Sequence, residues 1–236
     1  ENLQQLYALV EAQGGYFTAA QARQAGYAYS QQHFHVARGT WVRVERGIFR
    51  LRNFPPDEHE DLIRLTLWSR TQQGQPQVVV SHETALALHA LSDVLPARIH
   101  LTAPPGFRKS TPTGCVLHRA TLAAAEIEAR AGYRVTTPLR TLLDVAASPL
   151  SQEHLDKAVV QALERGMVRR AALETAPCAP MARQRLAQAL ASAPRVTELP
   201  ALSATMPPRR HSAAPCKLAY GLWLSNVASL CAACTC

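Results

Sequence analysis

The chain has 236 residues, which is long enough for one large domain or two small ones with buried cores. Hydrophobic residues make up 47% and charged residues 18%, a composition that excludes an intrinsically disordered protein. Lysine and arginine total 25 against 17 acidic residues, and this basic balance favours an anionic partner such as nucleic acid.

Three helices are predicted at the start of the chain. The first is amphipathic and ends at Gly14, and its polar sequence lacks the apolar core of a signal peptide, which predicts a cytoplasmic protein. After the short extended piece Tyr16-Phe17, Thr18 is expected to cap a helix from Ala19 to about Ala25. Ser30 is expected to cap the third helix, from Gln31 to Arg38.

A β-hairpin is predicted next, because two β-prone runs, 41–44 and 48–51, surround the turn Glu45-Arg46-Gly47. Helix, short strand, two helices and hairpin is the order of a winged helix-turn-helix. The segment from Thr18 to Phe54 carries six arginines and a single acid, Glu45. The positive charge therefore lies on the unit that would contact DNA.

The paired prolines after Phe54 predict a linker, since proline disfavours both the interior of a helix and the hydrogen-bond ladder of a β-sheet. Beyond it the pattern predicts a mixed α/β domain that ends in helices. The expected strands are 78–80, 98–102, 115–118 and 133–135, and the expected helices are 58–69, 82–91, 137–146, 152–165, 169–175 and 181–193. Ser81 and Thr137 are the expected caps of two of these helices, and Arg140 and Asp144 are spaced as an i,i+4 pair.

The fold class expected is therefore α/β of the α+β kind. A winged helix-turn-helix at residues 1–54 precedes a mixed α/β domain at residues 57–193. Residues 194–236 lack a sustained period and hold four of the six cysteines, so we expect them to be a tail outside the fold. The cysteines at 216, 231, 234 and 236 lack the turn chemistry of a zinc site, and the uncharged run 218–236 is interpreted as tail and not as a membrane anchor.

In a helix-turn-helix the second helix of the motif enters the major groove, and arginines of the wing contact the minor groove or the phosphates. Glutamine can bond adenine, and histidine or arginine can reach guanine. Phe34 with Ala37, or Gln32 with Val36, would form the buried face of this short helix, and the sequence leaves that choice open. The candidate DNA contacts are Thr18, Ser30, Gln31, Gln32, His35, Arg38, Arg43, Arg46 and Arg50.

These residues carry a family resemblance. The stretch from Gly15 to Thr18, then Ala22–Gly26, then Gly39–Leu51, resembles the N-terminal domain of AbiEi-type antitoxins. Ser81–Leu86 and Thr137–Asp144 resemble segments of the second domain of that family. The resemblance covers about Leu3 to Leu190.

What the resemblance implies is a repressor of its own operon that binds double-stranded operator DNA. The second domain would counteract a nucleotidyltransferase-like toxin from the same operon, without the need for a tight complex. Some relatives carry a nuclease-like C-terminal domain, and its acid pattern is not found after Pro149. A homodimer on DNA is left open.

Enzyme interpretations are weaker. His82-Glu83 with His89 lacks the spacing of a metalloprotease helix, the basic loop 104–114 lacks the phosphate-loop pattern, and no nucleophile-elbow motif occurs. We therefore expect no catalytic residue, no cofactor and no metal. Two alternatives stay open: a nucleic-acid-processing enzyme targeted by the winged helix, and a winged-helix module that docks the toxin.

Overall fold

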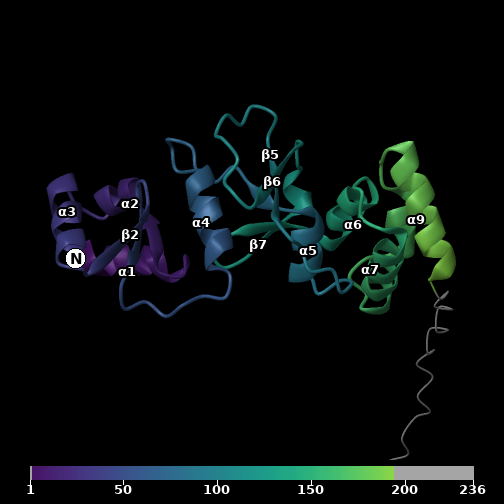
Figure 1. Ribbon diagram of the computed structural model, residues 1–236, viewed down its shortest axis with the longest axis horizontal. Helices are drawn as coiled ribbons and strands as arrows, with labels where there is room; N and C mark the ends of the chain where they lie inside the picture. The colour runs from purple at the N-terminus through teal and green to yellow at the C-terminus, as the bar shows by residue number, and fades with distance from the viewer. Residues whose placement is uncertain (1, 194–236) are drawn as a thin grey trace, which may run out of the picture. The chain divides into compact units, whose positions relative to one another are not determined.

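The computed structural model describes residues 2–193, which belong to one compact unit. The first part of the chain folds into three helices around a small antiparallel sheet of strand order β1-β3-β2 (Figure 1). Its elements are α1 (Asn2–Glu11), β1 (Tyr16–Thr18), α2 (Ala19–Gln24), α3 (Tyr29–Ala37), β2 (Trp41–Glu45) and β3 (Ile48–Leu51). This is the predicted winged-helix order, with the hairpin β2–β3 as the wing.

Of the two helix caps predicted in this part of the chain, one is present and the other is not. Thr18 caps α2 as predicted: its hydroxyl accepts from the backbone N–H of Gln21, whose side chain in turn accepts from the backbone N–H of Thr18. The prediction that Ser30 caps α3 is wrong. The helix begins two residues earlier than expected, at Tyr29, so Ala28 is the N-cap, and the side chain of Gln31 accepts from the Ala28 N–H at 2.8 Å.

Aromatic rings form the core of the winged helix. Phe17 is fully buried and meets the ring of Trp41 edge-on, with centroids 4.8 Å apart. Trp41 also packs edge-on against Tyr27, and it stacks on His35 of α3 with centroids 4.7 Å apart. These contacts hold α3 against the start of the wing.

The middle of the chain forms a mixed five-stranded sheet of order β6-β5-β4-β8-β7. The pairs β5–β6 and β4–β8 are parallel, and β4–β5 and β7–β8 are antiparallel. Its elements are α4 (Glu60–Ser69), β4 (Val79–Val80), α5 (His82–Leu88), β5 (Ile99–Ala103), β6 (Cys115–Arg119), the 3₁₀ turn η1 (Ala124–Glu126), β7 (Ile127–Ala129) and β8 (Arg134–Thr136). The sequence did not predict η1 and β7, which are short and lack a clear alternation.

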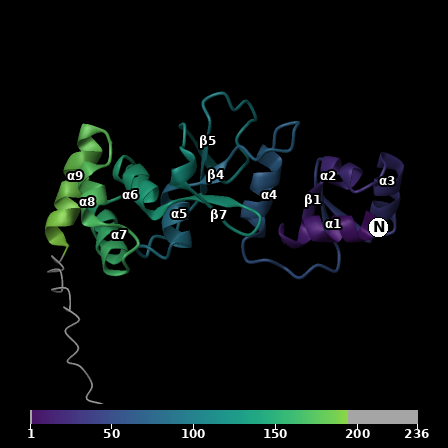
Figure 2. The same cartoon turned by 180° about the vertical axis from the view of Figure 1, so that it is seen from behind.

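Four helices complete the described chain: α6 (Pro138–Ala146), α7 (Gln152–Glu164), α8 (Arg170–Thr175) and α9 (Pro180–Ser192). The helices α6, α7 and α9 lie side by side in both views (Figures 1 and 2). Together with α8 they bury Leu142, Leu155, Leu173 and Leu186 completely in one cluster. The predicted mixed α/β class with C-terminal helices is thus confirmed.

Helix α4 contacts the first sheet as well as the second. Ile63 is fully buried in a cluster that includes Tyr16 of β1 and Val135 of β8. The hydroxyl of Tyr16 donates to Glu60 at 2.9 Å. Two arginines of this region bond back to the winged helix, Arg64 to Glu45 at 2.6 Å and Arg70 to Gln13 at 2.7 Å.

Within residues 2–193 no helix is both long and apolar enough to cross a membrane. The expectations for residues 194–236, including the cysteine-rich end and the uncharged run, concern a segment outside the described residues.

Gly15 generates a prediction of stability. Its φ is 84°, and a Cβ built there would lie 2.5 Å from the Cβ of Phe54. We expect Gly15→Ala to lower the free energy of unfolding by about 2–4 kcal/mol, from backbone strain and the clash together, measured by urea denaturation. Gly47 is the control, because its φ is 76° but no atom of the described residues lies within 4 Å of such a Cβ. Gly47→Ala should lose only about 1 kcal/mol, and an equal loss in the two variants would contradict the packing argument.

Candidate functional site

The exposed face of α3 carries aromatic and basic side chains. Phe34 is 53% and Tyr29 is 64% exposed. Ser30, His33 and Arg38 are also exposed on this helix. The exposed surface of α3 therefore combines two aromatic rings with a histidine and an arginine.

Gln32 requires a correction to the candidate DNA contacts. It is only 3% exposed, and its side-chain amide donates to the carbonyl oxygens of Tyr27 at 2.9 Å and of Ala19 at 3.2 Å. The amide is thus used to bind the turn between α2 and α3, and a duplex cannot reach it.

Four other candidates are held by contacts inside the protein. The side chain of Gln31 is exposed but accepts the N-cap hydrogen bond, and the hydroxyl of Thr18 caps α2. His35 is half-buried on Trp41 and lies 3.0 Å from the hydroxyl of Thr40. Arg50 is half-buried over the ring of Tyr16 and donates to the carbonyl oxygens of Phe54 and Pro55. These contacts favour positioning roles for the four residues.

The remaining candidates are available to a ligand. Ser30, Arg38, Arg43 and Arg46 are exposed, and within residues 2–193 none of their side chains has a hydrogen-bond or ion-pair partner. Arg38 lies at the C-terminal end of α3, and Arg46 at the turn of the wing. The structure therefore presents free positive charge on both the helix and the hairpin.

Sequence reasoning missed the aromatic part of this surface. The guanidinium of Arg38 lies 5.2 Å from the ring centroid of Phe34, and that of Arg23 lies 5.4 Å from the ring centroid of Tyr29. Each arginine is thereby oriented by an exposed ring. The one signal in the sequence was the i,i+4 spacing of Phe34 and Arg38 on a helix.

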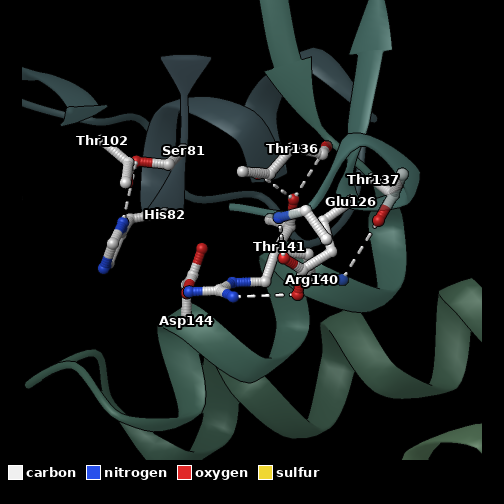
Figure 3. A network of polar contacts seen from close by, with 10 residues as sticks. Ser81, His82, Thr102, Glu126, Thr136, Thr137, Arg140, Thr141 and Asp144 are labelled. Atoms are coloured by element: carbon white, nitrogen blue, oxygen red, sulfur yellow. Dashed lines mark hydrogen bonds and ion pairs between the residues drawn. The ribbon is translucent and has the colours of Figure 1, made fainter. Parts of the chain in front are cut away.

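A second group of polar residues lies where α6 meets the five-stranded sheet (Figure 3). Thr137 caps α6 and Pro138 occupies its first turn, as predicted. The guanidinium of Arg140 lies between two acids, with Nε donating to Asp144 at 2.8 Å and Nη1 donating to Glu126 of η1 at 2.9 Å. The predicted i,i+4 pair is thus part of a three-residue network.

Asp144 is the most buried member of this network, with 9% of its surface exposed. Burial raises its pKa to about 6, against the opposing pull of Arg140. Its Oδ1 receives the Arg140 hydrogen bond, but its Oδ2 is buried without a partner among the described residues.

Three histidines form a cluster nearby: His82 begins α5, His100 lies on β5 and His118 lies on β6. The rings of His82 and His118 stack with centroids 3.5 Å apart, and Nε2 of His118 lies 3.2 Å from Nδ1 of His100. Burial, reinforced by the two neighbouring rings, lowers the pKa of His82 to about 3. The cluster is therefore uncharged near neutral pH. Within residues 2–193, no set of three histidine, cysteine, aspartate or glutamate side chains is placed to hold a metal ion.

We expect Arg140→Ala to lower the free energy of unfolding by about 2–3 kcal/mol, because it leaves two partly buried acids without their shared partner. Arg130→Ala is the matched control. Arg130 pairs with Glu128 at 3.0 Å on the surface, so its loss should change stability by less than about 0.5 kcal/mol in the same urea titration. Similar losses for the two variants would show that the network around Asp144 contributes no more than a surface ion pair.

Comparison with known proteins identifies the family. The model of the AbiEi antitoxin C-terminal domain matches residues 78–196, and the model of the transcriptional regulator, AbiEi antitoxin, matches residues 4–52. The fold is similar to the crystal structure of the RV2827C protein from Mycobacterium tuberculosis, with a TM-score of 0.54 at 16% identity, over 80% of this chain and 76% of that one. No curated protein sequence matches the chain. The resemblance inferred from the sequence is confirmed, and the chain belongs to the AbiEi antitoxin family of transcriptional regulators.

Proposed function

We propose that this protein is a repressor that binds double-stranded operator DNA, with α3 in the major groove and the β2–β3 wing beside it. The observation that carries the proposal is the free positive charge at two separate places on the winged helix. Arg38 lies at the end of α3, Arg43 on β2 and Arg46 at the wing turn. Phosphates on either side of a groove are the partners that such a placement suits.

The contact set proposed here is narrower than the one expected from sequence alone. Ser30, Arg38, Arg43 and Arg46 are proposed to touch DNA, together with the exposed ring of Phe34. Thr18, Gln31, His35 and Arg50 are proposed to hold α3 and the wing in place, and Gln32 has no role at the duplex.

The proposal extends to the rest of the chain. Residues 1–54 would act as the DNA-binding unit and residues 57–193 as the antitoxin unit, which would counteract a nucleotidyltransferase-like toxin of the same operon. The family assignment supports regulation and antitoxin activity in general. Autoregulation, the type of toxin, a cytoplasmic location and the absence of catalysis are parts of this proposal, and a homodimer on the operator is compatible with it.

The double variant Arg38→Ala/Arg46→Ala tests the DNA interface. Affinity for the duplex upstream of the protein's own gene, measured by fluorescence anisotropy, should fall at least about tenfold. The slope of log affinity against log salt should drop by about 2, because each lost phosphate contact removes close to one released counterion. The control is Arg98→Ala/Arg169→Ala, which removes two exposed arginines outside the winged helix and should change neither value. Unchanged affinity in the first variant would refute the proposed interface.

Phe34 yields a more specific prediction about base recognition. An exposed apolar ring in a major groove is suited to contact a thymine methyl group. Replacing the contacted thymine by uracil should weaken binding of the wild-type protein about fourfold, since one buried methylene is worth about 0.8 kcal/mol. Phe34→Ala should bind the two duplexes equally well, while Leu95→Ala, which removes a 92% exposed side chain elsewhere, should keep the discrimination. A uracil effect that persists in Phe34→Ala would assign the methyl contact to another residue.

A further inference from the structure

Glu45 is the only acid between Thr18 and Phe54, a segment of the sequence that carries six arginines. It ends β2 and directly precedes Arg46 at the turn of the wing. A carboxylate beside an arginine that is proposed to contact a phosphate would repel that phosphate, because charges act on one another over about 10 Å at 0.1 M salt. The wing therefore carries a charge that opposes the proposed DNA binding.

A β-bulge separates Glu45 from Arg43. In a regular strand, side chains two residues apart point to the same face. The register of β2 against β3 shifts between Arg43 and Glu45, and a bulge re-aims the side chains beside it. Arg43 is exposed, whereas Glu45 is half-buried and bonds to a side chain of α4. The wing thus presents its arginine to solvent and directs its acid to the second part of the chain.

Arg64 of α4 is the partner of Glu45. Its Nη2 donates to Oε1 of Glu45 at 2.6 Å, and its Nη1 donates to Oδ1 of Asp61, one turn earlier on α4, at 2.8 Å. The side chains of Arg64 and Glu45 keep 31% and 37% of their surface exposed, so the pair adds little to the stability of the fold. Its main consequence is electrostatic, because it neutralises the one negative charge of the wing.

We propose that Arg64 is a positioning residue for DNA binding, which acts through Glu45. It neutralises this carboxylate and holds it against α4, away from the phosphates that the wing contacts. The inference rests on the proposed DNA binding and adds to it a residue outside the winged helix. The second part of the chain thereby raises the affinity of the winged helix for the operator without touching the duplex.

The test is a double-mutant cycle in the full chain, with affinity for the duplex upstream of the protein's own gene measured by fluorescence anisotropy at about 50 mM salt, where screening is weak. Arg64→Ala should weaken binding about fivefold, because Glu45 is left without its partner. Glu45→Ala should bind at least as tightly as the wild-type protein. The double variant Glu45→Ala/Arg64→Ala should return to within about twofold of the wild-type affinity, since both charges of the pair are gone.

The double variant separates this role from two others. If Arg64 contacted a phosphate itself, or if its loss only displaced the wing, the removal of Glu45 would not restore the affinity. Arg64→Lys keeps the positive charge and should lose less than about twofold, which a role that depends on charge predicts. Urea denaturation checks that each variant is folded.

Lys157→Ala is the matched control. Lys157 of α7 pairs with Asp93 at 2.7 Å, so its loss changes the net charge of the chain by the same one unit outside the winged helix, and the affinity should stay unchanged. A wild-type protein that fails to bind the duplex would overturn the proposed function and this inference together. The role of Arg64 alone is overturned if Arg64→Ala binds as tightly as the wild-type protein, if the double variant is as weak as Arg64→Ala, or if Lys157→Ala shows an equal loss.

Discussion

The arrangement of the winged helix depends on one aromatic stack. Trp41 begins the wing, and its ring contacts Phe17 of β1 and His35 of α3 at centroid distances of 4.8 and 4.7 Å. A single buried ring therefore connects the sheet and the helix, and neither can rotate without separating the rings. With His35 and Gln32 turned inward, Phe34 and Arg38 are left on the outer face. The interior of the winged helix thus determines which side chains of α3 are exposed.

Local signals in the sequence were sufficient for most elements but not for the face of α3. Gly14, Thr18, Thr137 and the hairpin turn act within a few residues of their own position, so their effects could be predicted. The sequence left open whether Phe34 with Ala37 or Gln32 with Val36 forms the buried face of α3, and in the structure Gln32 is buried and Phe34 is exposed. Gln32 is buried because two carbonyl groups, one of them 13 residues earlier in the chain, accept its amide protons. Such a partnership is created by the fold, and residue type alone does not reveal it.

The same limit applies to the network around Arg140. The pair with Asp144 follows from helical spacing, and the sequence predicted it. Glu126 joins from η1, a turn that the sequence did not predict. With Glu126 beside it, the ion pair between Arg140 and Asp144 is partly buried, with side-chain exposures of 21% for Arg140 and 10% for Asp144, and does not lie on the open surface of the helix. Tertiary structure thereby changes the energy of an interaction whose existence was correctly expected.

Asp144 differs from the neighbouring buried polar groups, because those groups all have hydrogen-bond partners and one of its oxygens has none among residues 2–193. Thr102 donates to Ser81 at 2.8 Å, and the hydroxyls of Thr136 and Thr141 lie 2.7 Å apart, so the buried hydroxyls of this face satisfy one another. A fold that needed only stability would be served as well by a neutral side chain at position 144, because a buried ion pair rarely stabilises more than an apolar replacement does. The winged helix and its arginines give no reason for a charged group there. Within residues 2–193 Asp144 therefore keeps one oxygen buried without a donor, and the ion pair of its other oxygen with Arg140 is what offsets that cost.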